Sequence, residues 1–345
     1  MKFFLRIAFF LLVIHIPIWG FAQSADSASA ITALRKSVRI DGVIKTKLEM
    51  CYSDSVVMRI NVRNARVGIR GDIGEYVGFR MQVDFSNEGV FAPLDLYGIL
   101  KPAKWLSINL GQTLIPFDNP YIISPGETMF SNRAFVGKYF TPGSRDIGAV
   151  VKYKFPFDAI PLEWELGMFN GGRINNPRWT DKPSFAARLI AGSMDGFRAS
   201  AKLYRYSGET VEMLIWGADV HYANDRLRLQ AEVMNRTAHT TSRDLFGSYV
   251  QGMYTFDFKA PKMFHSLSPA LRWDAMGYDV MNDNTPDVNR LTYGIIFGLD
   301  LKPFDSRLRI DFEQYFVRNG HFAEFENRDA HVANNKLTIE LVLRF

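Results

Sequence analysis

The residue types that carry out covalent or metal chemistry are sparse in this sequence. It contains neither a Gly-x-Ser-x-Gly nucleophile motif nor a His-Glu-x-x-His metal motif. His321 and His331 fall in one predicted loop and could bind a metal, although a solvated loop is the simpler interpretation. Glu163 and Glu165 share a strand face, where paired carboxylates are more often wall charges than an acid–base couple. We therefore expect no catalytic residues, no metal site and no cofactor.

Composition narrows the class of protein. The chain has 345 residues, 47% hydrophobic and 22% charged, with a formal charge of +5. It lacks the repeated runs of about 20 apolar residues that a bundle of membrane helices needs, and it is too hydrophobic for a disordered chain. A single cysteine, Cys51, excludes a disulfide scaffold or a zinc–cysteine cluster within the chain. No continuous basic tract is present, so we expect no nucleic-acid partner. A soluble globular protein and a transmembrane β-barrel remain.

The N-terminus predicts export. Lys2 and Arg6 precede an apolar stretch over 7–21, and a small-x-small cleavage site ends at Ala22. A retained anchor is the alternative, but Pro17 interrupts the apolar stretch. The sequence thus divides into a signal peptide (1–22), a short N-terminal segment (23–36) and a single barrel domain (37–345).

The rest of the chain alternates between apolar and polar residues with a period of two. From Leu337 to Phe345 every second residue is apolar, while Thr338, Glu340 and Arg344 fall on the other face. Strands of about nine to eleven residues with one apolar face span outer membranes, whereas strands of soluble sandwiches usually have about five or six residues. We predict an all-β fold, a transmembrane antiparallel β-barrel of about 16 strands. The predicted strands are 38–52, 57–71, 75–86, 94–101, 105–114, 145–155, 162–170, 184–192, 197–207, 210–223, 226–238, 245–257, 268–278, 290–302, 306–318 and 335–345.

Residues 115–144 interrupt this alternation. The segment contains four prolines, and it carries Arg133 and Lys138, with Arg145 just beyond its end, against Asp118 and Glu127. An irregular insert of this length in a compact fold is usually functional. We predict that it folds into the lumen as an internal constriction loop. The alternative is an outward-facing loop over a neighbouring subunit.

Several stretches resemble the phosphate-selective O/P porin family, in a variant like those of Bacteroidetes. The similarity covers roughly residues 58–155, with weaker agreement through the last strand. It is carried by RNARVGIRG (63–71), FRMQVDF (79–85), GQTLIPF (111–117), SNRA (131–134) and PGSRDIG (142–148). The resemblance implies a sixteen-stranded, trimeric outer-membrane porin that passes small anions such as phosphate.

Charged residues on the polar strand faces are the candidate site. Rings of charge in a pore set ion preference through the local field, and the early strands are the richer in Arg and Lys. We expect a water-filled channel with a weak anion preference, in which Arg66, Arg80, Arg133 and Arg145 lie nearest the narrow point. The alternative for each residue is an ion pair that stiffens the wall. The full set of pore-lining or anion-binding candidates is Arg66, Arg70, Arg80, Arg133, Lys138, Arg145 and Lys152.

These features predict a location and partners. We expect the outer membrane of a Gram-negative bacterium, because aromatic residues gather near strand ends, as they do at lipid interfaces. The C-terminal strand ending at Phe345 is the type of signal that the barrel insertion machinery binds. Small anions or other small hydrophilic solutes, outer-membrane lipid and a homotrimer are the other expected partners. A plugged barrel with a structural or secretion-associated role, without general pore activity, is the competing function.

Overall fold

The structure is a computed structural model. It describes residues 37–345 except 54, 118–124, 127, 158–159, 239–243, 260–262, 279, 281–284, 302–303, 321 and 326–330. The predicted signal peptide (1–22), the segment 23–36, Asp118 and Glu127 therefore lie outside the described residues. The chain divides into a unit of residues 1–39 and a unit of residues 40–345, and the fold below is that of the second unit.

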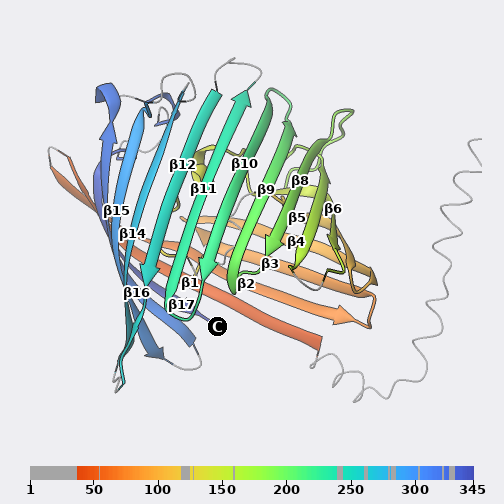
Figure 1. The fold of residues 1–345 in the computed structure, drawn as a ribbon, viewed down its shortest axis with the longest axis horizontal. Coiled ribbons are helices and arrows are strands. Elements are labelled where there is room, and N and C mark those ends of the chain that lie inside the picture. Colours follow the sequence, from red (N-terminus) through yellow and green to blue (C-terminus); the bar gives the residue numbers. More distant parts are fainter. Residues whose placement is uncertain are drawn as a thin grey trace, which may run out of the picture. The chain divides into compact units, whose positions relative to one another are not determined.

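Antiparallel strands account for nearly all regular structure in the described residues (Figure 1). The strands are β1 (Val38–Tyr52), β2 (Val56–Ile73), β3 (Val77–Asn87), β4 (Val90–Ala103), β5 (Leu106–Leu114), β6 (Arg145–Lys154), β7 (Leu162–Phe169), β8 (Ser184–Gly192), β9 (Gly196–Ser207), β10 (Glu212–Ala223), β11 (Leu227–Ala238), β12 (Asp244–Tyr254), β13 (Phe256–Asp257), β14 (Phe264–Tyr278), β15 (Val288–Leu301), β16 (Phe304–Val317) and β17 (Asn335–Arg344). No helix in this part of the chain is long and apolar enough to cross a membrane.

The sheet closes on itself. Each strand pairs with the next, and β1 pairs with both β2 and β17. β12 and the two-residue β13 both pair with β14, so they form one strand position and the barrel has 16. At the seam, the backbone N–H groups of Gly42 and Phe345 each donate to the carbonyl of the other, at 2.9 and 3.1 Å. The prediction of a sixteen-stranded antiparallel barrel is confirmed.

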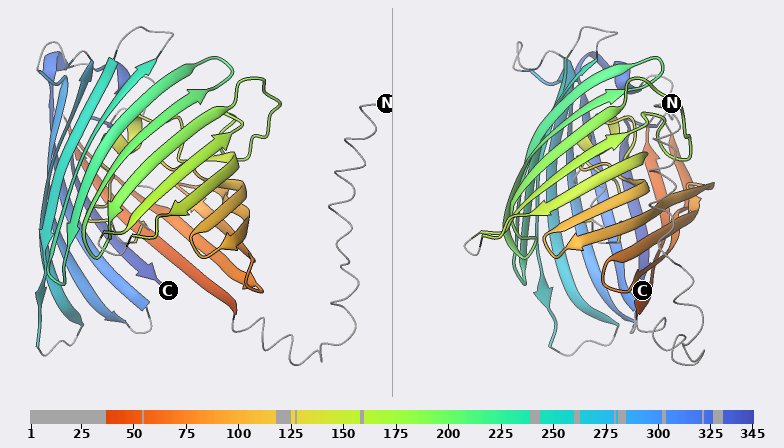
Figure 2. Two further views of the ribbon diagram at one scale, coloured as in Figure 1. Left: turned by 45° about the vertical axis from the view of Figure 1, so that its right-hand side comes forward. Right: turned by 90° about the vertical axis from the view of Figure 1, so that its right-hand side faces the viewer.

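The two rims of the barrel differ in the lengths of their links. We call the rim where β17 ends the terminal rim and the opposite one the loop rim (Figure 2). Links at the terminal rim are short, such as 74–76, 104–105 and 193–195. The longest links, including 115–144 and 318–334, join strands at the loop rim. This is the asymmetry expected of outer-membrane barrels.

Alternating side chains give the wall one apolar and one polar face over most of its height. On β9 and β10, Leu203, Trp216 and Val220 point outward and are 39–48% exposed, while Lys202 and Asp219 are buried inside. Period-two alternation places successive side chains on opposite faces of a strand. Over most of the height of these strands the outer face is therefore an apolar surface suited to lipid.

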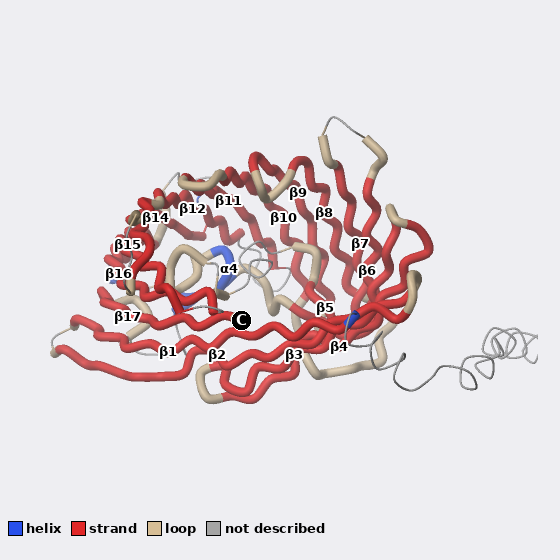
Figure 3. Tube along the Cα trace, turned by 90° about the horizontal axis from the view of Figure 1, so that it is seen from below, coloured by secondary structure: helices blue, strands red, loops and turns tan. Residues whose placement is uncertain are grey.

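Near the loop rim, however, part of the inner face is apolar. Five apolar side chains there are completely buried: Ile215, Met234, Leu245, Met276 and Val288. They belong to one hydrophobic cluster together with residues of the 115–144 segment. Figure 3 shows the short helix α4 (Val136–Tyr139) of this segment inside the ring of strands. The inner face of the barrel is therefore apolar where this segment packs against it.

Candidate functional site: a basic passage beside the internal segment

The described part of the 115–144 segment is hydrogen-bonded to carboxylates on the inner wall. The backbone N–H of Ser131 donates to Asp311 Oδ2 at 2.6 Å, and that of Phe135 donates to Asp274 Oδ2 at 3.1 Å. The side-chain amide of Asn132 donates to Glu313 Oε2 at 3.0 Å. These carboxylates come from β14 and β16, so the segment is fixed to that side of the barrel.

Arginines of the same wall bind the carbonyl groups of the segment. Arg272 Nη1 donates to the Asn132 carbonyl at 2.9 Å, and Arg290 Nη2 donates to the Arg133 carbonyl at 2.8 Å. The Arg290 guanidinium also lies 4.4 Å from the ring centroid of Phe135. Hydrogen bonds from charged donors are the stronger kind, and cation–π contacts add to them when they are desolvated.

Apolar packing holds the other side of the segment. Phe135, Tyr139 and Phe140 pack in the hydrophobic cluster with the inner wall, and Phe322 and Phe325 of the 318–334 link cover it at the loop rim. A buried core of this kind excludes water. The lumen between the segment and strands β10–β15 is therefore filled with protein at this height.

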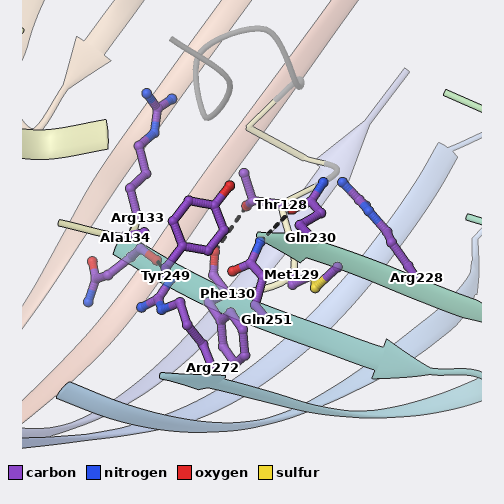
Figure 4. Close-up of a pocket in the computed structure, with 11 residues that line it drawn as sticks. Thr128, Met129, Phe130, Arg133, Ala134, Arg228, Gln230, Tyr249, Gln251 and Arg272 are labelled. Carbon is purple, nitrogen blue, oxygen red and sulfur yellow. Dashed lines mark hydrogen bonds between the residues drawn. The ribbon is translucent and has the colours of Figure 1, made fainter. Parts of the chain in front are cut away.

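Lower on the same side, only a small cavity remains between the segment and β11–β12 (Figure 4). It has a volume of about 30 Å³ and is lined by Gln230, Gln251 and Arg228 of the wall and by Thr128 and Phe130 of the segment. Gln251 donates to Gln230 Oε1 at 2.5 Å, which closes part of the space. A cavity needs roughly 10–15 Å³ for one water, so this one holds a few waters at most and admits no solute.

Larger spaces border other parts of the segment: one toward β1–β6 at the terminal rim, one farther inside, and one at the loop rim beside the links 170–183 and 208–211. The terminal-rim cavity has about 680 Å³, the inner cavity about 220 Å³ and the loop-rim cavity about 760 Å³. Pro125 lines both the first and the second, and Lys138 lines both the second and the third. Each of these residues borders two cavities, and the inner cavity is the smallest of the three.

The inner cavity is strongly basic. It lies between the segment and strands β1, β2, β15, β16 and β17, and its only acidic lining residues within the described chain are Glu49 and Glu88. Asn64, Ser131 and Asn132 add neutral polar groups. The basic lining residues are Lys45, Lys47, Arg59, Arg63, Arg133, Lys138, Arg290 and Lys336.

The terminal-rim cavity is basic as well, but its arginines are paired. Arg66 Nε lies 2.8 Å from Asp84 Oδ2, and Arg145 Nε lies 2.6 Å from Asp95 Oδ1. Arg80 pairs with Asp41, and Arg70 lies 3.9 Å from the same carboxylate. Buried pairs of this kind fix side-chain positions while they reduce the net field.

The structure separates the seven predicted site residues into three places. Arg66, Arg70, Arg80 and Arg145 line the terminal-rim cavity, and Arg133 and Lys138 line the inner cavity. Lys152 lies elsewhere, in a cavity at the terminal rim beside Trp105, where it pairs with Glu165 at 2.5 Å. The wall ion pairs that were the alternative prediction are present for Arg66, Arg70, Arg80, Arg145 and Lys152.

Arg59 and Arg63 also line the inner cavity, and neither was among the predicted site residues. Strict alternation along β2 puts these odd-numbered residues on the face opposite Arg66. In the structure, Ile60 and Val62 are exposed, and further along the strand Val67 and Ile69 are exposed, so the alternation shifts by one residue between them. The shift could have been inferred from the sequence. Charged residues at both odd and even positions of one membrane strand can face the lumen only if the alternation shifts by one residue.

The motif residues that carry the family resemblance support the segment at its two ends. Gln112 Nε2 donates to the carbonyls of Pro93 and Leu94, at 2.9 and 2.8 Å, where β5 enters the segment. Gly111 has a φ of 128°, and a Cβ there would lie 2.4 Å from the Leu96 carbonyl oxygen. Beyond the segment, Asp146 accepts from the Gly171 N–H at 2.8 Å. These residues set the chain path rather than the lining of a cavity.

Comparison with known proteins places the fold but not a family. No family model matches the chain, and no characterised protein matches its sequence. Among solved structures, a Salmonella typhi OmpF complex with daunomycin aligns with a TM-score of 0.65 at 12% identity, over 89% of this chain and 97% of that one. An anion-selective porin from Comamonas acidovorans aligns with a TM-score of 0.58 at 11% identity, over 90% and 99%. The trimer form of OmpT, an outer membrane protein of Vibrio cholerae, aligns at 0.59 and 12%, over 90% and 99%. These likenesses establish a porin-like barrel.

Proposed function

We propose that the chain forms an outer-membrane porin, a channel for passive diffusion of small hydrophilic solutes with a weak preference for anions such as phosphate. The observation that carries this proposal is the set of three cavities that border the internal segment, each with more basic than acidic lining residues. A positive wall raises the local concentration of anions and hinders the entry of cations. The similarity to an anion-selective porin supports the same direction.

The 115–144 segment is, in this proposal, the constriction. The inner cavity is the smallest of the three spaces, and the segment contributes Arg133 and Lys138 to it. The wall opposite contributes Lys47, Arg59 and Arg63. A solute that passes between them meets cationic side chains on both sides, at the point where its own hydration shell is most restricted. Motif similarity to the phosphate-selective O/P porins supports membership in that family.

Location follows from the same proposal. The apolar outer face suits a lipid environment, and the predicted signal peptide over 1–22 would bring the chain to the outer membrane. The last strand, with Phe345 at its end, would be bound by the insertion machinery. In this proposal the barrel is a channel without catalytic activity.

Assembly as a homotrimer is supported by an open strand edge. Among the described residues the register of β2 with β3 begins at Arg66, and the Arg63 carbonyl still accepts from the Glu88 N–H at 3.3 Å, so the β2 backbone from Val56 to Asn61 extends past the β3–β4 hairpin. Met58, Ile60 and Val62 on its outer face are 40–80% exposed. Open sheet edges do not occur against lipid, so we propose that a second copy of the chain covers this edge.

A plugged barrel remains the second candidate, favoured by the hydrophobic cluster that fills part of the lumen. Swelling of liposomes that contain the purified protein separates the two functions. A porin admits small sugars such as arabinose and the liposomes swell, whereas a plugged barrel leaves them unchanged. Empty liposomes provide the control.

A further inference from the structure

The two carboxylates of the inner cavity are held very differently. Glu49 is 2% exposed, with Lys47 Nζ 2.7 Å from one oxygen and Arg59 Nε 2.6 Å from the other. The side chain of Glu88 is 43% exposed, and its Oε1 lies 3.3 Å from Arg63 Nε, 3.8 Å from Lys47 Nζ and 3.9 Å from Arg59 Nη2. Charge-assisted hydrogen bonds have lengths of about 2.7–2.9 Å. Glu49 is therefore fixed in the wall, whereas Glu88 is loosely held by the same group of cations.

The backbone that carries Glu88 is nevertheless well anchored. Glu88 and Gly89 form the two-residue turn between β3 and β4, with φ angles of 54° and 89°. Turns with two left-handed residues favour Asn or Asp before Gly, so a glutamate is an unusual choice at the first position. The Glu88 N–H donates to the Arg63 carbonyl at 3.3 Å, and Arg63 Nη1 donates to Asn87 Oδ1 at 2.7 Å. A fixed turn thus presents a partly exposed carboxylate to the cavity.

We infer that Glu88 is a tethered competing anion: its carboxylate occupies the mouth of the inner cavity, beside Lys47, Arg59 and Arg63, and a permeating anion must displace it. This inference rests on the proposed porin function and names a residue that sets its selectivity. A displaced Glu88 side chain can turn into water, because it is already 43% exposed. An anion with a carboxylate or phosphate group offers the three cations the same type of oxygen ligand, and a divalent anion gains more from them than chloride does.

The size of the effect follows from simple electrostatics. A unit charge about 7 Å from a permeating ion in water changes the ion's local concentration about two- to threefold. Loss of the Glu88 charge should therefore raise the chloride-to-potassium permeability ratio about two- to threefold near 0.1 M salt. The increase should vanish near 1 M salt, where the Debye length is about 3 Å.

Reversal potentials in a KCl gradient across planar bilayers test the inference. Glu88→Gln removes the charge, and Glu88→Asn removes it with a residue that tolerates the left-handed turn, so the pair guards against a folding defect. Asp225→Asn in the β10–β11 turn at the terminal rim removes one carboxylate from another hairpin and serves as the control. We expect both Glu88 variants to increase anion preference and the control to match the wild type. Glu88 variants that equal the control, or that favour cations, overturn the inference.

A binding measurement separates this inference from the porin proposal. Titration of the detergent-solubilised barrel with inorganic phosphate, followed by calorimetry, does not depend on conduction. We expect Glu88→Gln to bind phosphate about two- to threefold more tightly than the wild type. Unchanged phosphate affinity together with unchanged selectivity refutes the role of Glu88 even if the wild type conducts. A wild type that conducts no ions refutes the porin function, whatever the titration gives.

Discussion

Replacing Phe135 with alanine tests whether the internal segment limits the passage. Phe135 is 1% exposed, its ring centroid lies 6.0 Å from that of Tyr139 and 6.2 Å from that of Tyr315, and Arg290 packs on its face. Truncation of a buried phenylalanine costs about 3–5 kcal/mol, because transfer energy is lost and a cavity remains. None of these contacts is a backbone hydrogen bond between strands. The loss of free energy therefore weakens the packing of the segment against the wall and not the pairing of the strands.

We therefore expect Phe135→Ala to loosen the segment while the barrel stays closed. Single-channel conductance should rise and become noisier, and proteolysis within the segment should accelerate, while the folded barrel should still migrate faster than the heated form on a denaturing gel. Phe157→Ala is the matched control, since Phe157 is 58% exposed and exposed substitutions usually change stability by less than about 0.5 kcal/mol. Unchanged conductance together with unchanged proteolysis would show that the segment is not held by this core.

Three further substitutions probe the passage, the seam and the assembly. Arg133→Glu changes the charge of the inner cavity by two. Each charge contributes about 0.5 kcal/mol at about 8 Å in water, so the chloride-to-potassium permeability ratio in bilayer recordings should fall about fivefold. An unchanged ratio would show that Arg133 does not line the passage. Gly42→Val should weaken heat-modifiable migration, because a Cβ at Gly42 would lie 2.9 Å from the Arg66 backbone carbonyl oxygen as well as 2.3 Å from the Phe345 ring. Migration equal to that of the wild type would contradict the seam geometry. Ile60→Arg should abolish the trimers that chemical cross-linking detects. Val220→Arg places the same charge on the outer face of β10 and should leave the trimers intact. The same yield of cross-linked trimer from both variants would exclude the β2 edge as the interface.

The barrel itself could be predicted from sequence because its two faces contact different environments. In β17 the apolar residues from Leu337 to Leu343 alternate with Thr338 and Glu340, and the predicted bounds (335–345) match the strand within one residue. Period-two patterning is a local property, and each strand pairs with its chain neighbour. Strand order therefore followed from chain order.

The filled part of the lumen could not be predicted by the same rule. Alternation assigns every inward face to water, but Ile215 faces inward between the outward residues Leu214 and Trp216. The run from Met213 to Trp216 is continuously apolar, and such a run indicates a strand that is buried on both faces. The 115–144 segment covers this apolar inner face, and it is far from β10 in the sequence. Local patterning therefore could not identify the partner of Ile215.

The basic inner cavity was only partly predictable for a similar reason. Arg133 and Lys138 were identified from the composition of the irregular segment, whereas Arg59 and Arg63 were hidden by a one-residue shift in the alternation of β2. Glu88 lies in a turn, and turn residues show no face by periodicity. Its role depends on the approach of the β3–β4 turn to Arg63, which is a tertiary contact.

The reversal potential of the wild-type protein in a KCl gradient tests the central claim most directly. A water-filled path along the basic side of the internal segment predicts ion conduction, with a potential displaced toward the chloride equilibrium value and a smaller displacement as the salt concentration rises. A bilayer that stays silent after insertion of the folded barrel, or a potential displaced toward the potassium equilibrium value, would contradict it.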